Sequence, residues 1–163
     1  MEEGKEHFIS KEPEKIFQIG NDINDMKNSY LIEDFLEVVK YELKIPNYHV
    51  RRKWTIDQKS DYVEQLILKG SFEPIVFYEK EYRAYEVIDG VERIKALVGF
   101  YTNKFAISKT KISDDLIGVK FHDLPWNLKR IFINNRIMAY IIEYKMSREQ
   151  KIDLMNRLNA DFD

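Results

Sequence analysis

The sequence predicts a single α+β domain, a small mixed sheet with flanking helices, and three observations lead to this expectation. Segments with helical spacing alternate with short apolar runs of strand length, and two of the helical segments open with a capping-box pattern. One strand-like run ends in Asp89-Gly90 and passes directly into a helical segment. We expect residues 1–28 to form a polar, partly disordered lead-in and residues 29–163 to form the domain.

The first half of the domain predicts two helices. Apolar residues at helical spacing predict one helix from Ser29, as its N-cap, to a stop at Pro46, followed by a short extended segment over 45–50. The second helix opens at Thr55, because a Thr hydroxyl and a Gln three residues later satisfy each other's free amides, and it ends near Gly70. Its predicted inner face consists of Tyr62, Val63, Leu66 and Ile67.

The centre of the chain predicts two strands and a helix. The strands cover 74–78 and 84–88, and the helix covers 92–100. The second half predicts loop and short strand over 103–120, a helix over 127–133, a strand over 136–142 and a final helix from a capping box at Ser147 to Asn159. Trp126 and the many Tyr and Phe residues are assigned to the core.

Composition excludes several classes of function. The 26 Lys and Arg residues nearly balance the 28 Asp and Glu residues, so bulk charge does not predict a nucleic-acid coat. The chain has no cysteine and only three scattered histidines, which excludes disulfide frameworks, thiol catalysis and Cys-based metal sites. No apolar run approaches the ~20 residues that cross a bilayer, and the polar first residues do not resemble a secretory signal. We therefore expect a cytoplasmic protein without membrane partners.

The strand-to-helix junction at 89–93 is the candidate site. A helix N-terminus presents unpaired amides and a partial positive charge, and Gly90 lets the backbone approach a phosphate closely. Arg93 can bind phosphate through two parallel hydrogen bonds. Asp89 is a candidate ligand for Mg²⁺ or a group that orients Arg93, and Glu92 is a candidate general base. From the residues alone, an ordinary Asp-Gly turn with surface charges is the more frequent explanation.

Several sequence motifs that occur in a fixed order make a binding site more favoured than an ordinary turn. The string Tyr85–Leu97 resembles the V-[VI]-D-G-Q-Q-R-L-T-x-L signature of the GmrSD-type N-terminal domain, a member of the ParB/sulfiredoxin-like superfamily. Trp54 matches the tryptophan of the family's Q-R-x-Y-x-W motif, and 70–75 resembles its G-x-P-x-P-P-I segment. Residues 121–125 resemble F-x-D-L-P, and 156–159 resemble the late F-x-R-L-N. The resemblance covers roughly residues 30–160.

The resemblance implies a ParB/sulfiredoxin-like fold that binds a nucleoside triphosphate, with Mg²⁺ as the expected accompanying ion, in a bacterial or phage protein related to restriction and defence. The D-G-Q-Q-R loop of the family lines the phosphates, which here implies Asp89, Gly90 and Arg93. Arg51, Arg52 and Trp54 stand where the family's earlier motif contributes to the site. A nuclease or another protein is the implied partner.

Departures from the family pattern predict weak hydrolysis or none. Val91 and Glu92 replace the two glutamines, and a carboxylate near a triphosphate is repulsive without a cation. Val91 also stands where sulfiredoxin has its cysteine, and no paired-histidine nuclease motif is present. Two alternatives therefore stay open. The chain is a non-catalytic interaction module, either a scaffold or a phage decoy for a nuclease, or it is an adaptor that binds DNA through Arg51-Arg52-Lys53 and stacks a base on Trp54.

Overall fold

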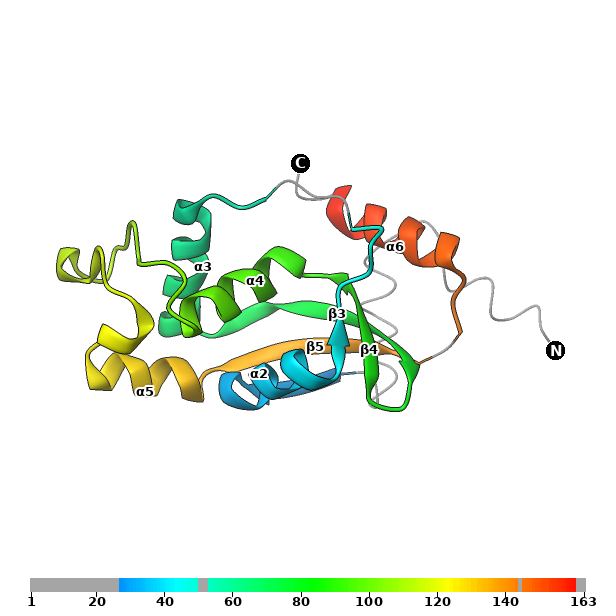
Figure 1. Ribbon diagram of the computed structural model, residues 1–163, viewed down its shortest axis with the longest axis horizontal. Helices are drawn as coiled ribbons and strands as arrows, with labels where there is room; N and C mark the ends of the chain where they lie inside the picture. The colour runs from blue at the N-terminus through cyan, green and yellow to red at the C-terminus, as the bar shows by residue number, and fades with distance from the viewer. Residues whose placement is uncertain (1–26, 50–52, 144, 161–163) are drawn as a thin grey trace.

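The computed structural model describes residues 27–49, 53–143 and 145–160, and its centre is a five-stranded mixed sheet (Figure 1). The strands are β1 (Lys27–Leu31), β2 (Leu43–Lys44), β3 (Ser71–Glu81), β4 (Ala84–Asp89) and β5 (Arg136–Ile142). Their order across the sheet is β1-β5-β3-β4-β2. The β1–β5 and β3–β4 pairs are antiparallel, whereas β3–β5 and β2–β4 are parallel. The domain is therefore α+β, as the sequence predicts.

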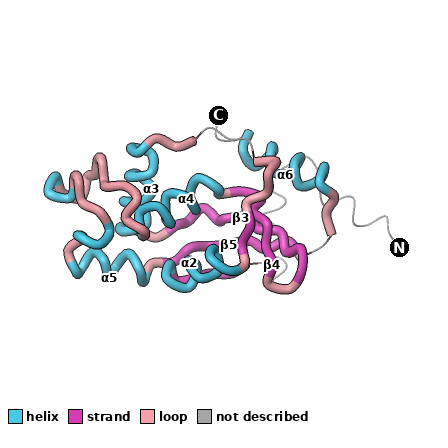
Figure 2. The backbone as a smooth tube through the Cα atoms, in the orientation of Figure 1, coloured by secondary structure: helices cyan, strands magenta, loops and turns pink. Residues whose placement is uncertain are grey.

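Helices cover the sheet, and Figure 2 shows them around its strands. In the described ranges the α-helices are α2 (Ile32–Tyr41), α3 (Ile56–Leu68), α4 (Val91–Tyr101), α5 (Trp126–Asn134) and α6 (Arg148–Ala160). Two 3₁₀ turns, η3 (Asp114–Leu116) and η4 (Phe121–Asp123), lie between α4 and α5 along the chain.

The main core lies on one face of the sheet, beneath α2, α3, α4 and α5. Alternate strand residues such as Ile75 and Phe77 point to this face, as the two-residue period of a strand requires. Phe77 stacks on Phe35 of α2, with ring centroids 6.0 Å apart, and Phe100 of α4 contacts Phe132 of α5 edge to face. Aromatic contacts therefore join α2 to the central strand and α4 to α5.

The opposite face carries a second, smaller core that α6 covers. Val76, Tyr78 and Ile88 point to this face and pack with Leu154 and Leu158 of α6. Lys151 of α6 forms an ion pair of 2.8 Å with Glu86 of β4, and its ammonium group lies 4.0 Å from the centre of the Tyr78 ring. An apolar contact and a charged contact together hold α6 on the sheet.

Most of the predicted elements are confirmed. Both capping boxes are present, since the Thr55 hydroxyl accepts from the Gln58 amide and Ser147 and Gln150 exchange the equivalent bonds. The four residues predicted for the inner face of α3 are all buried. The predicted strand over 136–142 coincides with β5. Strand β4 ends one residue later than predicted, and α4 and α5 are each one residue longer at both ends.

The bounds of two elements differ more from expectation. Helix α2 ends at Tyr41 rather than near Pro46, because the chain turns there into β2, which pairs with β4. The extended segment predicted over 45–50 is thus displaced toward the N-terminus. Strand β3 extends beyond the predicted 74–78 in both directions, since β4 and β5 pair with it on its two sides.

Three expectations are wrong. Ser29 is not a helix N-cap, because 27–31 form β1 against β5 and α2 begins only at Ile32. The pairing partner lies more than a hundred residues away, so local spacing does not reveal it. Residues 103–120 contain η3 and loop but no strand of the sheet. Trp126 is not a core residue, since 71% of it is exposed at the start of α5. Among the described residues, no helix combines the length and apolarity that a membrane crossing requires.

Candidate functional site

The backbone changes direction at Gly90, between the end of β4 and the start of α4. Gly90 has φ 105° and ψ 16°, a left-handed conformation that glycine adopts without the strain of a Cβ. A Cβ at this position would also meet Ile75 of β3 at 3.1 Å. The prediction that Asp89-Gly90 ends a strand and that a helix follows at once is confirmed, and this turn leaves the first amides of α4 without partners inside the helix.

Arg93 is the centre of a buried network behind this turn. Its Nη2 donates to Asp89 Oδ2 at 2.7 Å, and its Nη1 donates to the carbonyl oxygens of Glu73 at 2.8 Å and Pro74 at 3.3 Å. Asp89 and Arg93 are only 7% and 8% exposed. The guanidinium therefore ties the end of β4 and the start of α4 to the first part of β3. Of the two roles predicted for Asp89, the structure shows a contact that orients Arg93.

Glu92 connects the helix start to the segment that precedes α3. Its Oε2 accepts a hydrogen bond from the backbone amide of Trp54 at 3.0 Å, and its Oε1 lies 3.3 Å from the Lys95 ammonium. Glu92 is 6% exposed, and the Trp54 ring contacts Tyr62 edge to face. Trp54 and Pro74, which lies near the start of β3, thus both contact the Asp89–Arg93 loop.

The other end of the same segment is also held at β4. The imidazole Nε2 of His49 hydrogen-bonds to the carbonyl oxygen of Val87, two residues before Asp89. Arg51 and Arg52 lie outside the described residues, and Lys53 is exposed. The chain therefore contacts the last part of β4 at His49 and the first turn of α4 at Trp54.

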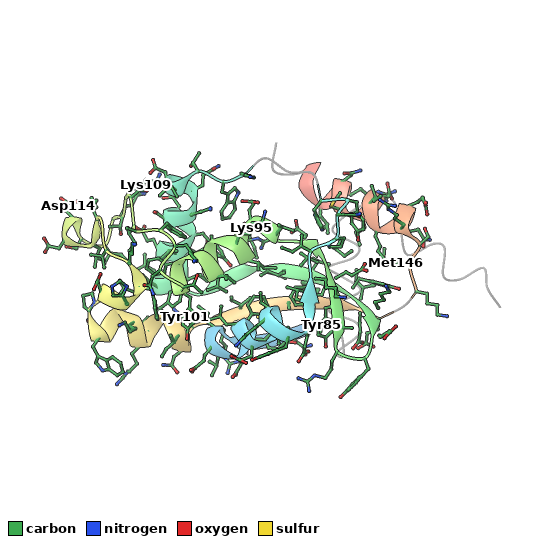
Figure 3. All side chains as sticks on the ribbon, in the orientation of Figure 1. Tyr85, Lys95, Tyr101, Lys109, Asp114 and Met146 are labelled. Atoms are coloured by element: carbon green, nitrogen blue, oxygen red, sulfur yellow. The ribbon has the colours of Figure 1, made fainter. Side chains whose placement is uncertain are left out.

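The structure brings together Asp89, Glu92, Arg93 and Trp54, and it adds two participants that the sequence does not predict. One is Lys95, whose side chain is 47% exposed and lies near the beginning of α4 (Figure 3). Its spacing of three residues from Glu92 is the available signal, because side chains at that spacing are neighbours on a helix. The other is the pair of β3 carbonyls that hold Arg93, for which no sequence signal exists.

A second charged cluster lies at the β4–α6 contact. The Tyr48 ring stacks on the His49 imidazole, and the Arg148 guanidinium lies 5.9 Å from the centre of the Tyr48 ring. The Glu86 carboxylate interacts with both Tyr48 and Lys151. Burial and this carboxylate raise the pKa of Tyr48 to about 12. The phenol therefore stays protonated to a higher pH than that of an ordinary tyrosine.

The described residues do not form a metal centre. Among them, no group of three or more His, Cys, Asp or Glu side chains converges in the way a metal ion requires. Asp89 presents a single carboxylate whose Oδ2 is already bound by Arg93. These residues alone do not fit a Mg²⁺ cage, and we derive no step through a metal.

The chain was compared with known families, sequences and structures. No protein-family model matches the chain, and no curated protein sequence matches it. Among solved structures, the C-terminally truncated chromosome-partitioning protein ParB from Caulobacter crescentus, complexed with CTP-γ-S, is similar with 12% identity and a TM-score of 0.46. The similarity covers 83% of this chain and 53% of the ParB chain, so the chain spans about half of that structure.

Proposed function

We propose that this chain is a nucleotide-binding domain that holds a triphosphate at the start of α4. The observation that carries the proposal is the left-handed Gly90, which joins β4 to α4 without a linker. A helix N-terminus in this arrangement presents amide donors and a partial positive charge to an anion.

The contacts of His49 and Trp54 support the same location for the binding site. The segment 49–54 is tied to the junction at both ends, by His49 on Val87 and by Trp54 on Glu92. The two residues Arg51 and Arg52 lie between these ties in the sequence, and we propose that they bind phosphate while Trp54 lines the base or sugar. Arg93 contributes to phosphate binding only when a phosphate replaces part of its contact with Asp89.

We further propose that the chain is a ParB/sulfiredoxin-like domain of the GmrSD N-terminal type, from a bacterial or phage protein related to restriction and defence. The motif strings of Tyr85–Leu97 and the segments around it support this assignment. Hydrolysis is weak or absent in this proposal. The candidate general base Glu92 is engaged by the Trp54 amide and Lys95, and its charge replaces a neutral glutamine of the family pattern.

A thermal-shift screen with ATP, GTP, CTP and UTP, each with and without Mg²⁺, tests the proposal. A nucleotide present at about 100 times its dissociation constant adds about 2.7 kcal/mol to stability. We expect one or more nucleotides to raise the Tm of the wild type and the combined variant Arg51→Ala/Arg52→Ala to lose the effect. Lys145→Ala, an exposed charge beside α6, serves as the control and keeps it. If no nucleotide raises the Tm at concentrations up to millimolar, the proposal is contradicted.

A non-catalytic interaction module is the second candidate, and one observation favours it. Both charged residues of the Glu92-Arg93 pair already have partners inside the chain, so the loop is stable without a ligand. In this case the Asp89–Arg93 loop is a structural element, and no nucleotide raises the Tm.

A further inference from the structure

The helices α2 and α5 form an exposed surface whose two halves have opposite charge. The two helices pack against each other, and the Ile32 amide at the start of α2 donates to the carbonyl oxygen of Asn135 directly after α5. The helices therefore follow one another along one side of the molecule, at the bottom of the view in Figure 1. We call their outward faces the α2–α5 surface.

The α5 half of this surface is basic and aromatic. Its exposed residues are Trp126, Asn127, Arg130, Ile131 and Asn134. Trp126 is 71% exposed and Ile131 is 47% exposed, although both are large apolar residues. The helix itself contains no acidic residue. Exposed Trp and Arg side chains together are the residues most enriched in the energetic centres of protein interfaces.

The α2 half is acidic and ends in an aromatic residue. Its exposed residues are Glu33, Asp34, Glu37, Lys40 and Tyr41. Tyr41 is 69% exposed, and the Lys40 ammonium lies 4.8 Å from the centre of its ring. Within the ranges that the structure describes, no ion pair within 4.0 Å engages the side chains of Glu33, Asp34, Glu37 or Arg130. Lys40 attracts the Glu37 carboxylate from a longer distance.

The order of these residues is complementary when one copy is turned against another. Starting at the end of α5 that lies away from α2, every fourth residue is exposed: Trp126, Arg130 and Asn134. Starting at the end of α2 that lies away from α5, the same spacing gives Tyr41, Glu37 and Glu33. A step of four residues rises about 6 Å on either helix, so the two series match in length when they run antiparallel. Trp126 then meets Tyr41, and Arg130 meets Glu37.

We propose that the α2–α5 surface is the interface of a symmetric dimer in which α5 of each copy lies on α2 of the other. A two-fold axis near the junction of the two helices makes both contacts at once, because in such an interface residue i contacts residue j and j contacts i. The occupant is a second copy of this chain, since the acidic half that complements Arg130 and Trp126 is present on the same molecule.

The size of the surface limits the strength of the dimer. Its ten exposed residues per copy are fewer than the roughly 20–30 residues a side of a standard interface, so it belongs to the small, transient class. We therefore expect a weak dimer, with a dissociation constant on the order of 10 to 100 µM.

Sedimentation velocity of the full chain over micromolar to sub-millimolar concentrations measures the association. Arg130→Glu and Glu37→Arg each place two like-charged contacts in the dimer, and we expect each variant alone to weaken association by about tenfold or more.

An equimolar mixture of the two variants restores both attractive contacts. In the mixed dimer, the charge reversed at position 130 of one copy meets the charge reversed at position 37 of the other. At the second contact the unchanged Arg130 meets the unchanged Glu37. The mixture therefore forms a heterodimer with an affinity near that of the wild type.

The controls are Lys145→Glu and Glu143→Arg, which reverse exposed charges in the segment between β5 and α6, outside both helices of this surface. Both should associate as the wild type does, and circular dichroism should show that all four variants are folded. Recovery in the mixture supports the proposed interface. A wild type that remains monomeric at sub-millimolar concentration overturns the proposal, and so does a dimer that neither single variant weakens.

Discussion

The buried ion pair between Asp89 and Arg93 joins the last residue of β4 to the first turn of α4 across the left-handed Gly90. The two charged atoms are 2.7 Å apart, and both side chains are about nine-tenths buried. The same guanidinium also binds the Glu73 and Pro74 carbonyls. The pair is therefore part of the fold of the loop, whatever ligand the loop binds.

We predict that Arg93→Ala lowers the free energy of unfolding by about 3–5 kcal/mol, because it leaves the Asp89 carboxylate buried without this countercharge. Urea denaturation at neutral pH measures the loss. Lys109→Ala is the control, since Lys109 pairs with Asp61 at 3.0 Å and the two side chains are 51% and 58% exposed. The control should cost far less, because water screens an exposed ion pair. Equal losses in both variants contradict a structural role for the buried pair.

A second prediction concerns Gly90. Gly90→Ala should destabilise the protein by about 1–3 kcal/mol from its left-handed backbone, with a further loss from the contact of the new Cβ with Ile75. Gly118→Ala separates the two effects, because Gly118 also has a positive φ of 84° but has no atom within 4 Å of its Cβ position. We expect both variants to unfold at lower urea concentration than the wild type, and Gly90→Ala to lose more. A Gly90→Ala variant as stable as Gly118→Ala would show that the Ile75 contact relaxes freely.

A third prediction uses the bond between the Glu92 carboxylate and the Trp54 amide. Trp126→Phe leaves Trp54 as the single tryptophan, so fluorescence then reports on the segment before α3. In that background, Glu92→Ala removes the acceptor, and we expect the Trp54 emission to shift to the red as its surroundings become wetter. Glu92→Gln keeps an acceptor oxygen and should leave the emission unchanged. If both variants shift equally, the negative charge of Glu92, rather than its hydrogen bond, holds the segment.

Glu92→Gln also bears on the proposed ligand. It removes a negative charge beside the proposed triphosphate site while retaining the geometry, so we expect it to bind nucleotide more tightly than the wild type. Isothermal titration of the two proteins with the nucleotide that raises Tm most measures the difference. Unchanged affinity would place the phosphates away from Glu92.

Local sequence signals predict the elements whose causes are local. The capping boxes at Thr55 and Ser147 locate two helix starts, because hydrogen bonds over three residues determine them. The switch from an apolar run to helical spacing locates the turn at Gly90. Strand β1 is not predicted, because its pairing with β5 joins residues such as Ser29 and Met138, and no local pattern encodes a contact between residues so far apart in the sequence.

The candidate site, too, has a part that the sequence predicts and a part that it does not. The residues Asp89 to Arg93 and Trp54 can be found from motif order, but the partners of Arg93 cannot. A guanidinium at the start of a helix can face a ligand or the protein, and only the position of the β3 carbonyls decides between them. The core assignment of Trp126 fails for a related reason, since aromatic character predicts burial in general but not which face of α5 meets the core.

The last prediction concerns alkaline pH. Burial, with neighbouring charges such as Glu86, raises the pKa of Tyr48 to about 12, and burial also raises the pKa of Tyr85 to about 12 from an ordinary value of 10.0. Below pH 10 both phenols are neutral in the folded and unfolded chains, so their contribution to stability is fully present. Between pH 10 and 12 the unfolded chain loses these protons first, and the free energy of unfolding must fall. Urea denaturation at a series of pH values measures this decline. Tyr48→Phe removes one ionising group and should make the decline shallower, whereas Tyr82→Phe should not, because Tyr82 is 89% exposed and folding hardly changes its surroundings. A decline that is equally steep in all three proteins would mean that Tyr48 ionises as readily in the folded chain as in the unfolded one.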